Sequence, residues 1–506
     1  MRTLIAILLC VAGQAQAGPV CETVAWPVYG EAHSPDHIYR ATAGGLEVTE
    51  RDSGTSRLLT TCDGLPSTHV LAVTAYGDGA VLAVRGGGLW RLSPGGQVTP
   101  VGPSEPLRWA TAVTSLGDDL VVGTVSDGVV RLVPDGAGWR LTRPWPKWSK
   151  GRTTALLASE DGLWVGRDQQ GLWTLDARGR ERRVLRGSVQ GLSKTPEGLL
   201  VDRGIEVCVA RGNRCTASEA PVSVAPPAGQ LPSNHVTSLA VYPGPEGAPA
   251  LWAGTFDQGV VVRVGERWER PDVVGEAPRF VNQVVAAPDA LWVATSTGAY
   301  RLQDGRWTRY GEPAGLLTDR VNGLSVDDGR VWFATSQGLS VWGERGISTV
   351  TQRDGLPHRI VHAITSWDGA VYAGTSDGLA VIRDGQVTVL RTEAGAISAN
   401  WITALLATPD GVLSGTYDRG VDHLTGPRPT PLEGLGPVWV NPHGVWQDPA
   451  DGTLYVATLG EGLWHGEGAA WSRVQAPLPS NDVTAVARLD GLWVATREGL
   501  LHLSEL

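Results

Sequence analysis

The sequence predicts an all-β protein built from about twelve four-stranded repeats. A short apolar segment recurs about every 40 residues, and Leu-Trp-Val-Ala-Thr stands at both 291–295 and 492–496. A Gly follows most copies within three or four residues, and 66 Gly and 33 Pro punctuate the chain. Short strands with Gly turns at this period are typical of β-propeller blades, whereas helical repeats carry an apolar stripe of period 3.6.

Each copy ends in a residue, usually Thr, that we name the anchor residue. The strand before it is apolar without alternation, as in Val-Trp-Phe-Ala at 331–334, which predicts that both of its faces are covered. Blades packed around an axis cover both faces in this way. The anchor residues are Thr42, Arg85, Thr124, Arg167, Arg203, Thr255, Thr295, Thr335, Thr375, Thr416, Thr458 and Thr496.

We expect two tandem propellers, a first of about five blades at 18–220 and a second of about seven at 221–506. The last unit stops after a third strand, and propellers close by completing such a blade. The widest interval between anchor residues, from Arg203 to Thr255, holds a surplus segment at 221–227. We interpret this segment as the missing strand; a six-plus-six division or one large ring are the alternatives.

The N-terminus has the order of a secretory signal. Arg2 precedes an apolar run at 4–11 and then Ala15-Gln16-Ala17, so we predict a signal peptide at 1–17. No later run is long enough to span a bilayer. The formal net charge of -10 argues against nucleic-acid binding. We therefore expect a periplasmic or secreted protein without a membrane span.

Four of the five cysteines remain after the predicted cleavage, an even number in an oxidising compartment. Cys208 and Cys215 flank a turn signal and are predicted to form a disulfide across a hairpin. Cys21 and Cys62 then pair by elimination. The alternative, a metal site, lacks a CxxC spacing and a nearby His.

The repeat resembles a known family. Gly64-Leu65-Pro66-Ser67 leads into one unit, Leu478-Pro479-Ser480-Asn481 into another, and Leu-Trp-Val-Gly/Ala-Thr-x-x-Gly-Leu follows at the anchor. This combination resembles the two-component regulator propeller repeat, over about residues 24–506. That family builds the periplasmic sensing region of hybrid sensor kinases, usually as two tandem propellers. The transmembrane, membrane-proximal and kinase segments of such proteins are missing from this sequence.

The motifs that suggest catalysis have structural explanations. Gly374-Thr375-Ser376-Asp377-Gly378 matches a nucleophile elbow, but it lies in a strand-to-strand hairpin, where that motif does not work. Carboxylates at the hairpin tips leave two alternatives open, a carbohydrate-active hydrolase or lyase and Ca²⁺ binding. We expect no catalytic residue, cofactor or metal ligand. The tip carboxylates are Asp127, Asp168, Asp257, Asp377, Asp418, Glu461 and Glu498.

The loops that lead into each unit predict a binding face. They emerge beside the hairpins after the anchor residues, around the mouth of the axial channel, and carry polar and aromatic residues that suit a small molecule, a glycan or an envelope protein. We predict a non-enzymatic binding protein, with a structural or assembly factor of the envelope as a further alternative. The candidate ligand-binding residues are Asn234, His235, Arg320, Arg359, His362, Trp401, Trp439, His443 and Asn481.

Pairing of all four cysteines predicts that the mature protein has no free thiol. A thiol assay on denatured, unreduced protein is expected to give no more than a trace signal. A stoichiometric signal would contradict the predicted pairing.

Overall fold

The computed structural model describes residues 18–504 except 160–161, 177, 196–197, 204–206, 212–213, 218–227, 328 and 426–429. The predicted signal peptide at 1–17, the surplus segment at 221–227 and the predicted domain boundary after residue 220 lie outside the described residues. No helix within the described ranges has the length and apolar character that crossing a bilayer requires.

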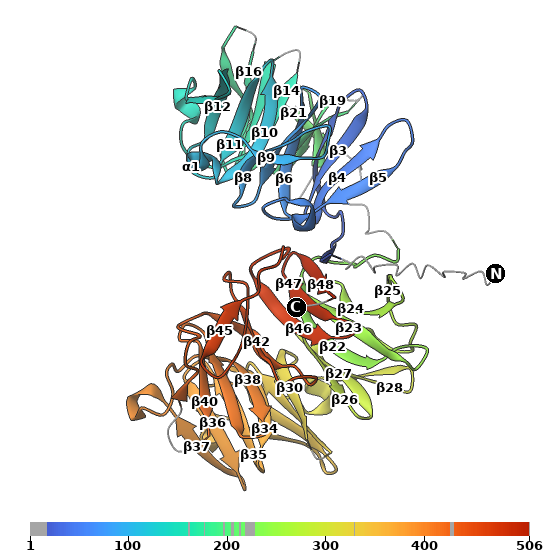
Figure 1. Ribbon diagram of the computed structural model, residues 1–506, viewed down its shortest axis with the longest axis vertical. Helices are drawn as coiled ribbons and strands as arrows, with labels where there is room; N and C mark the ends of the chain where they lie inside the picture. Colours follow the sequence, from blue (N-terminus) through green and yellow to red (C-terminus); the bar gives the residue numbers. More distant parts are fainter. Residues whose placement is uncertain are drawn as a thin grey trace, which may run out of the picture.

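The predicted fold class is confirmed. Twelve four-stranded antiparallel sheets form two lobes joined at a waist (Figure 1). In eleven of these twelve sheets the four strands follow one another along the chain, so each sheet is a meander of hairpins. The short helices lie in the connections: η1 (Thr61–Asp63), α1 (Ser104–Leu107), η2 (Pro146–Trp148), η3 (Glu312–Ala314), η4 (Gln352–Asp354) and η5 (Thr392–Ala394).

Five sheets make up the first lobe. Their strands are β2 (Val28–His33), β3 (His37–Thr42), β4 (Gly45–Glu50), β5 (Ser56–Leu59); β6 (Val70–Tyr76), β7 (Gly79–Val84), β8 (Gly88–Leu92), β9 (Val98–Pro100); β10 (Ala110–Leu116), β11 (Asp119–Thr124), β12 (Val129–Asp135), β13 (Gly138–Thr142); β14 (Thr153–Ser159), β15 (Gly162–Arg167), β16 (Gly171–Leu175), β17 (Glu181–Leu185); β18 (Gly191–Thr195), β19 (Gly198–Asp202), β20 (Val207–Arg211) and β21 (Arg214–Ala217).

Seven sheets make up the second lobe. Their strands are β22 (Val236–Pro243), β23 (Pro249–Thr255), β24 (Gly259–Val264), β25 (Arg267–Glu269); β26 (Val281–Ala287), β27 (Ala290–Thr295), β28 (Gly298–Gln303), β29 (Arg306–Tyr310); β30 (Val321–Asp327), β31 (Arg330–Thr335), β32 (Gly338–Gly343), β33 (Gly346–Val350); β34 (Val361–Trp367), β35 (Ala370–Thr375), β36 (Gly378–Arg383), β37 (Gln386–Leu390); β38 (Ile402–Thr408), β39 (Gly411–Thr416), β40 (Val421–Leu424), β41 (Thr430–Pro431); β42 (Val440–Gln447), β43 (Leu454–Thr458), β44 (Leu463–Glu467), β45 (Ala470–Arg473); β46 (Val483–Arg488), β47 (Leu492–Thr496), β48 (Gly499–Leu503) and, from the N-terminus, β1 (Val20–Glu22).

The first strand of each sheet contacts the first strand of the next sheet, and in both lobes the series returns to its start. In the first lobe β18 contacts β2, and in the second lobe β46 contacts β22. The first strands therefore line the axis of each ring. Buried aliphatic and aromatic side chains fill the wedges between sheets, as Trp292 does beside Phe333, with ring centroids 5.9 Å apart.

Each anchor Thr holds the hairpin that follows it. The Thr295 hydroxyl donates to the carbonyl of Gly298 at 2.7 Å and accepts from the backbone N–H of Thr297 at 3.0 Å. Gly298 has a φ of 128°, a backbone conformation that is costly for any residue with a side chain. Thr295 is fully buried. The same arrangement recurs around the second ring, so the hairpins end at equivalent places.

The last sheet is completed by the N-terminus and not by the surplus segment, which corrects the prediction for residues 221–227. Strand β1 pairs antiparallel with β48, in the register Val20 with His502 and Glu22 with Leu500. The edge of β48 is thereby covered. The described part of the chain thus starts in the second lobe, crosses into the first and then returns to the second.

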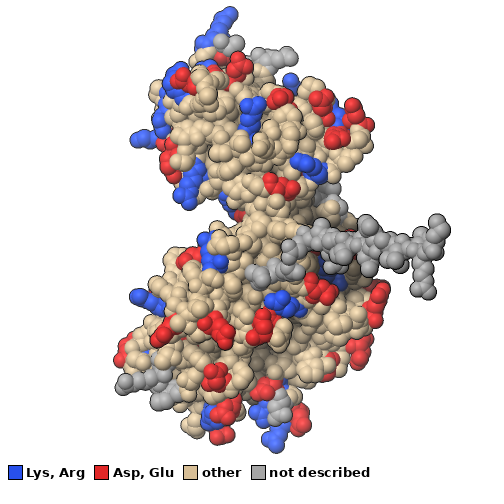
Figure 2. Space-filling view, in the orientation of Figure 1, with Lys and Arg blue, Asp and Glu red and all other residues tan. Residues whose placement is uncertain are grey.

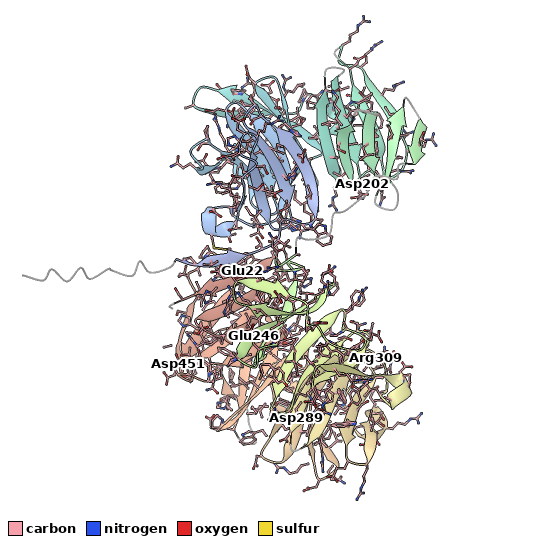
Figure 3. All side chains as sticks on the ribbon, turned by 90° about the vertical axis from the view of Figure 1, so that its right-hand side faces the viewer. Glu22, Asp202, Glu246, Asp289, Arg309 and Asp451 are labelled. Carbon is pink, nitrogen blue, oxygen red and sulfur yellow. A yellow bond between two sulfur atoms is a disulfide. The ribbon has the colours of Figure 1, made fainter. Side chains whose placement is uncertain are left out.

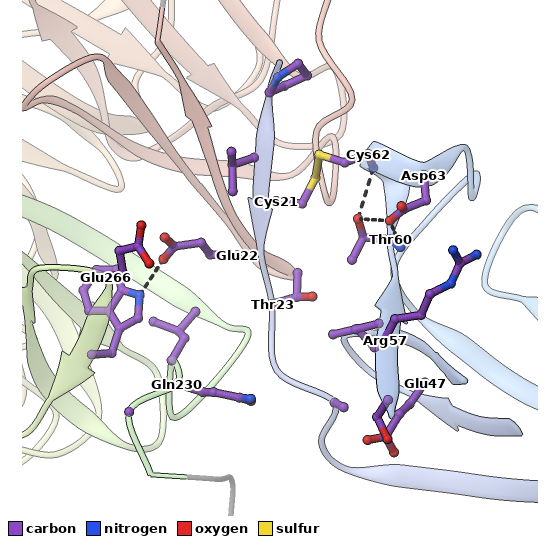
Figure 4. A pocket seen from close by; sticks show the side chains of 18 residues that line it. Cys21, Glu22, Thr23, Glu47, Arg57, Thr60, Cys62, Asp63, Gln230 and Glu266 are labelled. Carbon is purple, nitrogen blue, oxygen red and sulfur yellow. Dashed lines mark hydrogen bonds between the residues drawn. A yellow bond between two sulfur atoms is a disulfide. The ribbon is translucent and has the colours of Figure 1, made fainter. Parts of the chain in front are cut away.

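This crossing joins the two lobes (Figures 3 and 4). The predicted Cys21–Cys62 disulfide is confirmed, and it links β1 of the second lobe to η1 of the first. On the other side of β1, Glu22 accepts a hydrogen bond from the Trp268 indole N–H at 2.5 Å. A pocket of about 570 Å³ lies beside the disulfide. Cys208 is disulfide-bonded as well, and the side chain of its predicted partner, Cys215, lies outside the described residues.

Removal of β1 is expected to destabilise the last sheet selectively. In a variant that lacks residues 18–23 and carries Cys62→Ser, amide exchange should accelerate in β46–β48 and stay unchanged in β26–β28, because only β48 loses its neighbour. The matched control is Cys21→Ser/Cys62→Ser, which keeps the strand. Equal exchange in the deletion and the control would contradict the role of β1.

The control itself should lose stability. The disulfide closes a sequence separation of 41 residues, for which the chain-entropy model gives about 4 kcal/mol.

Candidate functional site

The candidate site lies at one end of the second ring, where two loops of each sheet run side by side. The backbone N–H of Phe256, after one anchor Thr, donates to the carbonyl of His235 at 2.9 Å. The N–H of Tyr417 donates likewise to Trp401 at 3.0 Å, and that of Leu459 to Trp439 at 2.9 Å. We name this end, formed by the lead-in residues and the residues after the anchors, the second mouth. The equivalent end of the first ring is the first mouth.

Three aromatic rings stack in a row on the second mouth, and we name them the aromatic column. Tyr417 lies between Trp401 and Trp439, with ring centroids 4.4 Å and 5.6 Å away and interplanar angles of 14° and 18°. The two indoles are 44% and 46% exposed. His362 adjoins the column, 6.0 Å from Trp401 between ring centroids. The column therefore joins two neighbouring sheets, and His362 extends the contact to a third.

A second aromatic group lies on the same mouth. His235 stacks on Phe256 at 4.8 Å, and Phe280 meets Phe256 edge-on at 6.5 Å. The two Phe side chains are 50% and 42% exposed. Sequence analysis missed Phe256, Phe280 and Tyr417. A signal was available for two of them, since Phe256 and Tyr417 follow anchor Thr residues where other copies carry Ser, such as Ser296.

Several polar lead-in residues hold the ring together instead of facing solvent. The Asn282 amide donates to the carbonyl of Val321 in the next sheet at 2.7 Å. The Asn322 amide likewise donates to the carbonyl of Val361 in the following sheet at 2.7 Å. These side chains sit in the bulge that each first strand makes at its start. They act as links between sheets.

Asn234 has a structural position, which differs from the exposed binding position predicted for it. The side chain is buried, and its amide oxygen accepts from the N–H of Val24 at 2.8 Å. Its amide nitrogen donates to the carbonyls of Val24 at 2.9 Å and Trp26 at 3.3 Å. Asn234 therefore binds the crossing chain where the lobes meet, and its hydrogen-bonding groups are occupied.

His443 reaches across the axial channel. In β42, Val440 pairs with Thr458 and Val445 with Val456, so residues 441–444 oppose Ala457 alone and form a wide bulge. His443 has a φ of 57° in this bulge, and its Nε2 lies 3.0 Å from the carbonyl oxygen of Asn322, three sheets away. A Cβ on Gly323 would come within 2.5 Å of the His443 ring, so only Gly fits there. The bulge thus links two sheets that are not neighbours in the ring.

The remaining predicted binding residues lie around the second mouth and differ in exposure and in hydrogen-bond partners. Arg320 and Arg359 are exposed. Asn481 is also exposed, and its side-chain oxygen accepts from Arg473 at 2.8 Å. His362 lies 2.8 Å from the Ser376 hydroxyl. The structure thus brings His362, Trp401 and Trp439 together, whereas Asn481 lies in the loop before β46, where its carbonyl accepts from the backbone N–H of Gly460 at 3.2 Å.

The histidines of the mouth are uncharged at neutral pH. Burial, together with the charge of Arg497, lowers the pKa of His235 to about 4. Burial and the neighbouring His443, His358 and Arg320 lower the pKa of His362 to about 4. Burial also lowers the pKa of His443. These side chains contribute hydrogen bonds and ring faces, not positive charge.

The hairpin-tip carboxylates do not converge on a metal site. No group of three His, Cys, Asp or Glu side chains that could hold an ion occurs among the residues described. Asp377 pairs with Arg391 at 3.0 Å, Asp127 with Arg143 at 3.4 Å, and Asp168 accepts from Ser188 at 3.0 Å. Two tip carboxylates, Asp257 and Glu498, line a pocket between the lobes.

The low pKa of His362 has a consequence for stability. Unfolded His binds a proton near pH 6.5, but folded His362 does so only near pH 4, so its contribution to the free energy of unfolding falls as the pH drops through this window. We expect the stability of wild type relative to His362→Gln to decrease between pH 6.5 and 4. Denaturant unfolding at a series of pH values measures this, with the difference at pH 8 as reference. A pH-independent difference would contradict it.

Comparison with known proteins agrees with this architecture. No protein-family model and no curated protein matches the sequence. PorZ, a surface component of the type-IX secretion system of Porphyromonas gingivalis, is 14% identical with a TM-score of 0.58, over 96% of this chain and 87% of that one. The extracellular domain of a proposed hybrid two-component system of B. thetaiotaomicron is 15% identical with a TM-score of 0.44, over 97% and 76%.

The extracellular domain of a proposed one-component system of B. thetaiotaomicron is 15% identical with a TM-score of 0.43, over 94% and 69%. Over nearly its whole length, the chain shares the β-propeller fold of PorZ.

Proposed function

We propose that this chain is an exported, non-enzymatic β-propeller protein that binds a partner protein or ligand through its second mouth. The observation that carries the proposal is the exposed aromatic column of Trp401, Tyr417 and Trp439. Trp and Tyr are the residues that contribute most to binding at protein interfaces. A rigid ring that presents loop residues at one end suits recognition.

The stacking within the column indicates what it contacts. The faces of Tyr417 are covered by the two indoles, so a sugar ring has no free Tyr face to stack on. The two indoles are 44% and 46% exposed, and neither indole N–H has a hydrogen-bond partner among the described residues. Indole N–H groups seek acceptors, such as the carbonyls of a polypeptide. This favours a partner protein over a glycan.

Exposed apolar side chains gather on the mouths. The described residues include ten large hydrophobic side chains that are exposed, and six of them belong to the two mouths. Such concentrations on a soluble surface mark interaction sites. Figure 2 shows that the waist between the lobes is hollowed on one side and carries few charged side chains there. The six are Trp109, Val125, Phe256, Phe280, Trp401 and Trp439.

Export is supported by the predicted signal peptide and by the Cys21–Cys62 disulfide, since disulfides persist in oxidising compartments. The resemblance to sensing regions of two-component regulators suits the same location. We propose the periplasm or the cell exterior as the place of action.

The alternative is a carbohydrate-active hydrolase or lyase, and one observation favours it. Asp482 and Glu498 line the same pocket, and burial raises the pKa of both. A glycosidase needs one protonated and one ionised carboxyl at the same pH. Turnover of aryl glycosides by the wild type, lost in Glu498→Gln, would establish this alternative.

Truncation of the column is expected to weaken binding without unfolding the protein. A thermal-shift screen of the mature chain against peptides, glycans and envelope proteins identifies the partner. Trp401→Ala and Trp439→Ala should each weaken its binding by at least about tenfold, or about 1.4 kcal/mol.

The matched control is Trp471→Ala, on outer strand β45 of the sheet that follows Trp439. Its indole donates to the carbonyl of Gly468 at 3.0 Å, away from the mouth. Equal affinity in Trp401→Ala and wild type would contradict the proposal. Unfolding of Trp401→Ala would assign this residue to the core instead.

A further inference from the structure

A polar pocket of about 370 Å³ lies where the two mouths meet, and we name it the junction pocket. Its size suits a small ligand. The first lobe contributes Trp26, Pro27, Ala43, His69 and Arg85, and the second contributes Ser233, Asn234, His235, Asp257, Ser480, Asp482, Arg497 and Glu498.

The walls of the pocket are fixed by contacts between the lobes. Ser67 of the first lobe donates from its hydroxyl to Glu498 Oε2 at 2.9 Å, and Thr68 donates to the Glu498 carbonyl at 3.2 Å. Asn234 holds the crossing chain at Val24 and Trp26. Ligand groups bound here therefore face both lobes at once.

The pocket contains three carboxylates, Asp257, Asp482 and Glu498. Hydrogen bonds and nearby cationic side chains of the protein compensate the charges of Asp482 and Glu498. Asp482 pairs with Arg497 at 3.0 Å and accepts from the Asn441 amide at 2.8 Å. Glu498 accepts from Ser67 at 2.9 Å and lies 3.8 Å from Arg85 and 3.7 Å from His69, and burial raises its pKa.

The two most weakly compensated charges of the pocket have opposite signs and belong to different lobes: Asp257 of the second and Arg85 of the first. Asp257 has no ion pair within the described part of the chain, and its Oδ1 is buried without a hydrogen bond. Arg85 comes no closer than 3.8 Å to Glu498, and its side chain is 60% exposed. An uncompensated buried carboxylate is costly, so a cation that pairs with it is favoured.

The two histidines of the pocket do not supply that cation. Burial lowers the pKa of His69 to about 4, assisted by the charge of Arg85, and the pKa of His235 is lowered to about 4 as described above. Both are neutral at pH 7. Their rings are held by stacking, on Tyr29 at 5.1 Å and on Phe256 at 4.8 Å.

We propose that the junction pocket binds a small zwitterion, a free α-amino acid, with its ammonium group at Asp257 and its carboxylate at Arg85. A guanidinium binds a carboxylate through two parallel hydrogen bonds, and the ammonium group supplies a donor to Asp257 Oδ1, while Oδ2 accepts, among the described residues, only from Gln258 at 3.5 Å. Because the two anchoring residues belong to different lobes, the ligand connects them. This site is separate from the aromatic column, so neither proposal depends on the other.

Thermal shift with the twenty protein L-amino acids, each at about 10 mM, is expected to give a hit in the full mature chain. Titration calorimetry of that amino acid should then show binding at least about tenfold weaker in Asp257→Asn and in Arg85→Gln. Its amide, which lacks the carboxylate, and its N-acetyl derivative, which lacks the ammonium group, should bind wild type at least as weakly.

Asp418→Asn is the matched control, because Asp418 follows Thr416-Tyr417 as Asp257 follows Thr255-Phe256, and it is exposed. This variant and Trp401→Ala should bind the amino acid as wild type does. Absence of a shift with all twenty amino acids would overturn the proposal. Unchanged affinity in Asp257→Asn, with the same melting temperature as wild type, would also overturn it.

Discussion

The hydrogen bond from a buried Thr hydroxyl to the carbonyl of the turn Gly is the interaction on which the arrangement of the second mouth depends, since all seven sheets of that ring have it. It occurs in nine of the twelve sheets. The side chain that follows this Thr is thereby fixed at the end of the ring axis. The residue that follows differs between the sheets: it is Ser after Thr295, but Phe after Thr255 and Tyr after Thr416. The contact repeated within the sheets thus fixes the place of a side chain whose identity varies.

Most of the fold could be predicted, because its determinants are local. The apolar strand, the Thr and the turn Gly stand within a few residues of each other, so each copy carries its own evidence. Strand β1 could not be found in this way. It consists of Val20, Cys21 and Glu22, and its pairing with residues 500–502 leaves no local pattern. The surplus segment at 221–227 was the more visible candidate, and it was wrong.

The candidate site was predictable in composition but not in geometry. Trp401 and Trp439 were identified because bulky residues in a lead-in loop have no other evident use. The spacing of the repeats does not predict that Tyr417 stacks between Trp401 and Trp439. This stacking depends on the angle at which the two neighbouring sheets pack. The role of His443 depends on a bulge, which lengthens one strand by residues that sequence alone assigns to a loop.

The pairing of β1 with β48 determines the order in which the lobes can form. The first ring is built from one continuous stretch, 28–217, and all of its strands are present long before synthesis ends. The last sheet of the second ring cannot be completed until β48 has been made. Strand β1, which pairs with β48, is made first and lies far from it in the sequence. Contacts of such sequence separation form slowly, and an open strand edge invites association with other chains. A newly made molecule therefore passes through a stage with one finished ring and one unfinished ring, when it most needs protection from aggregation.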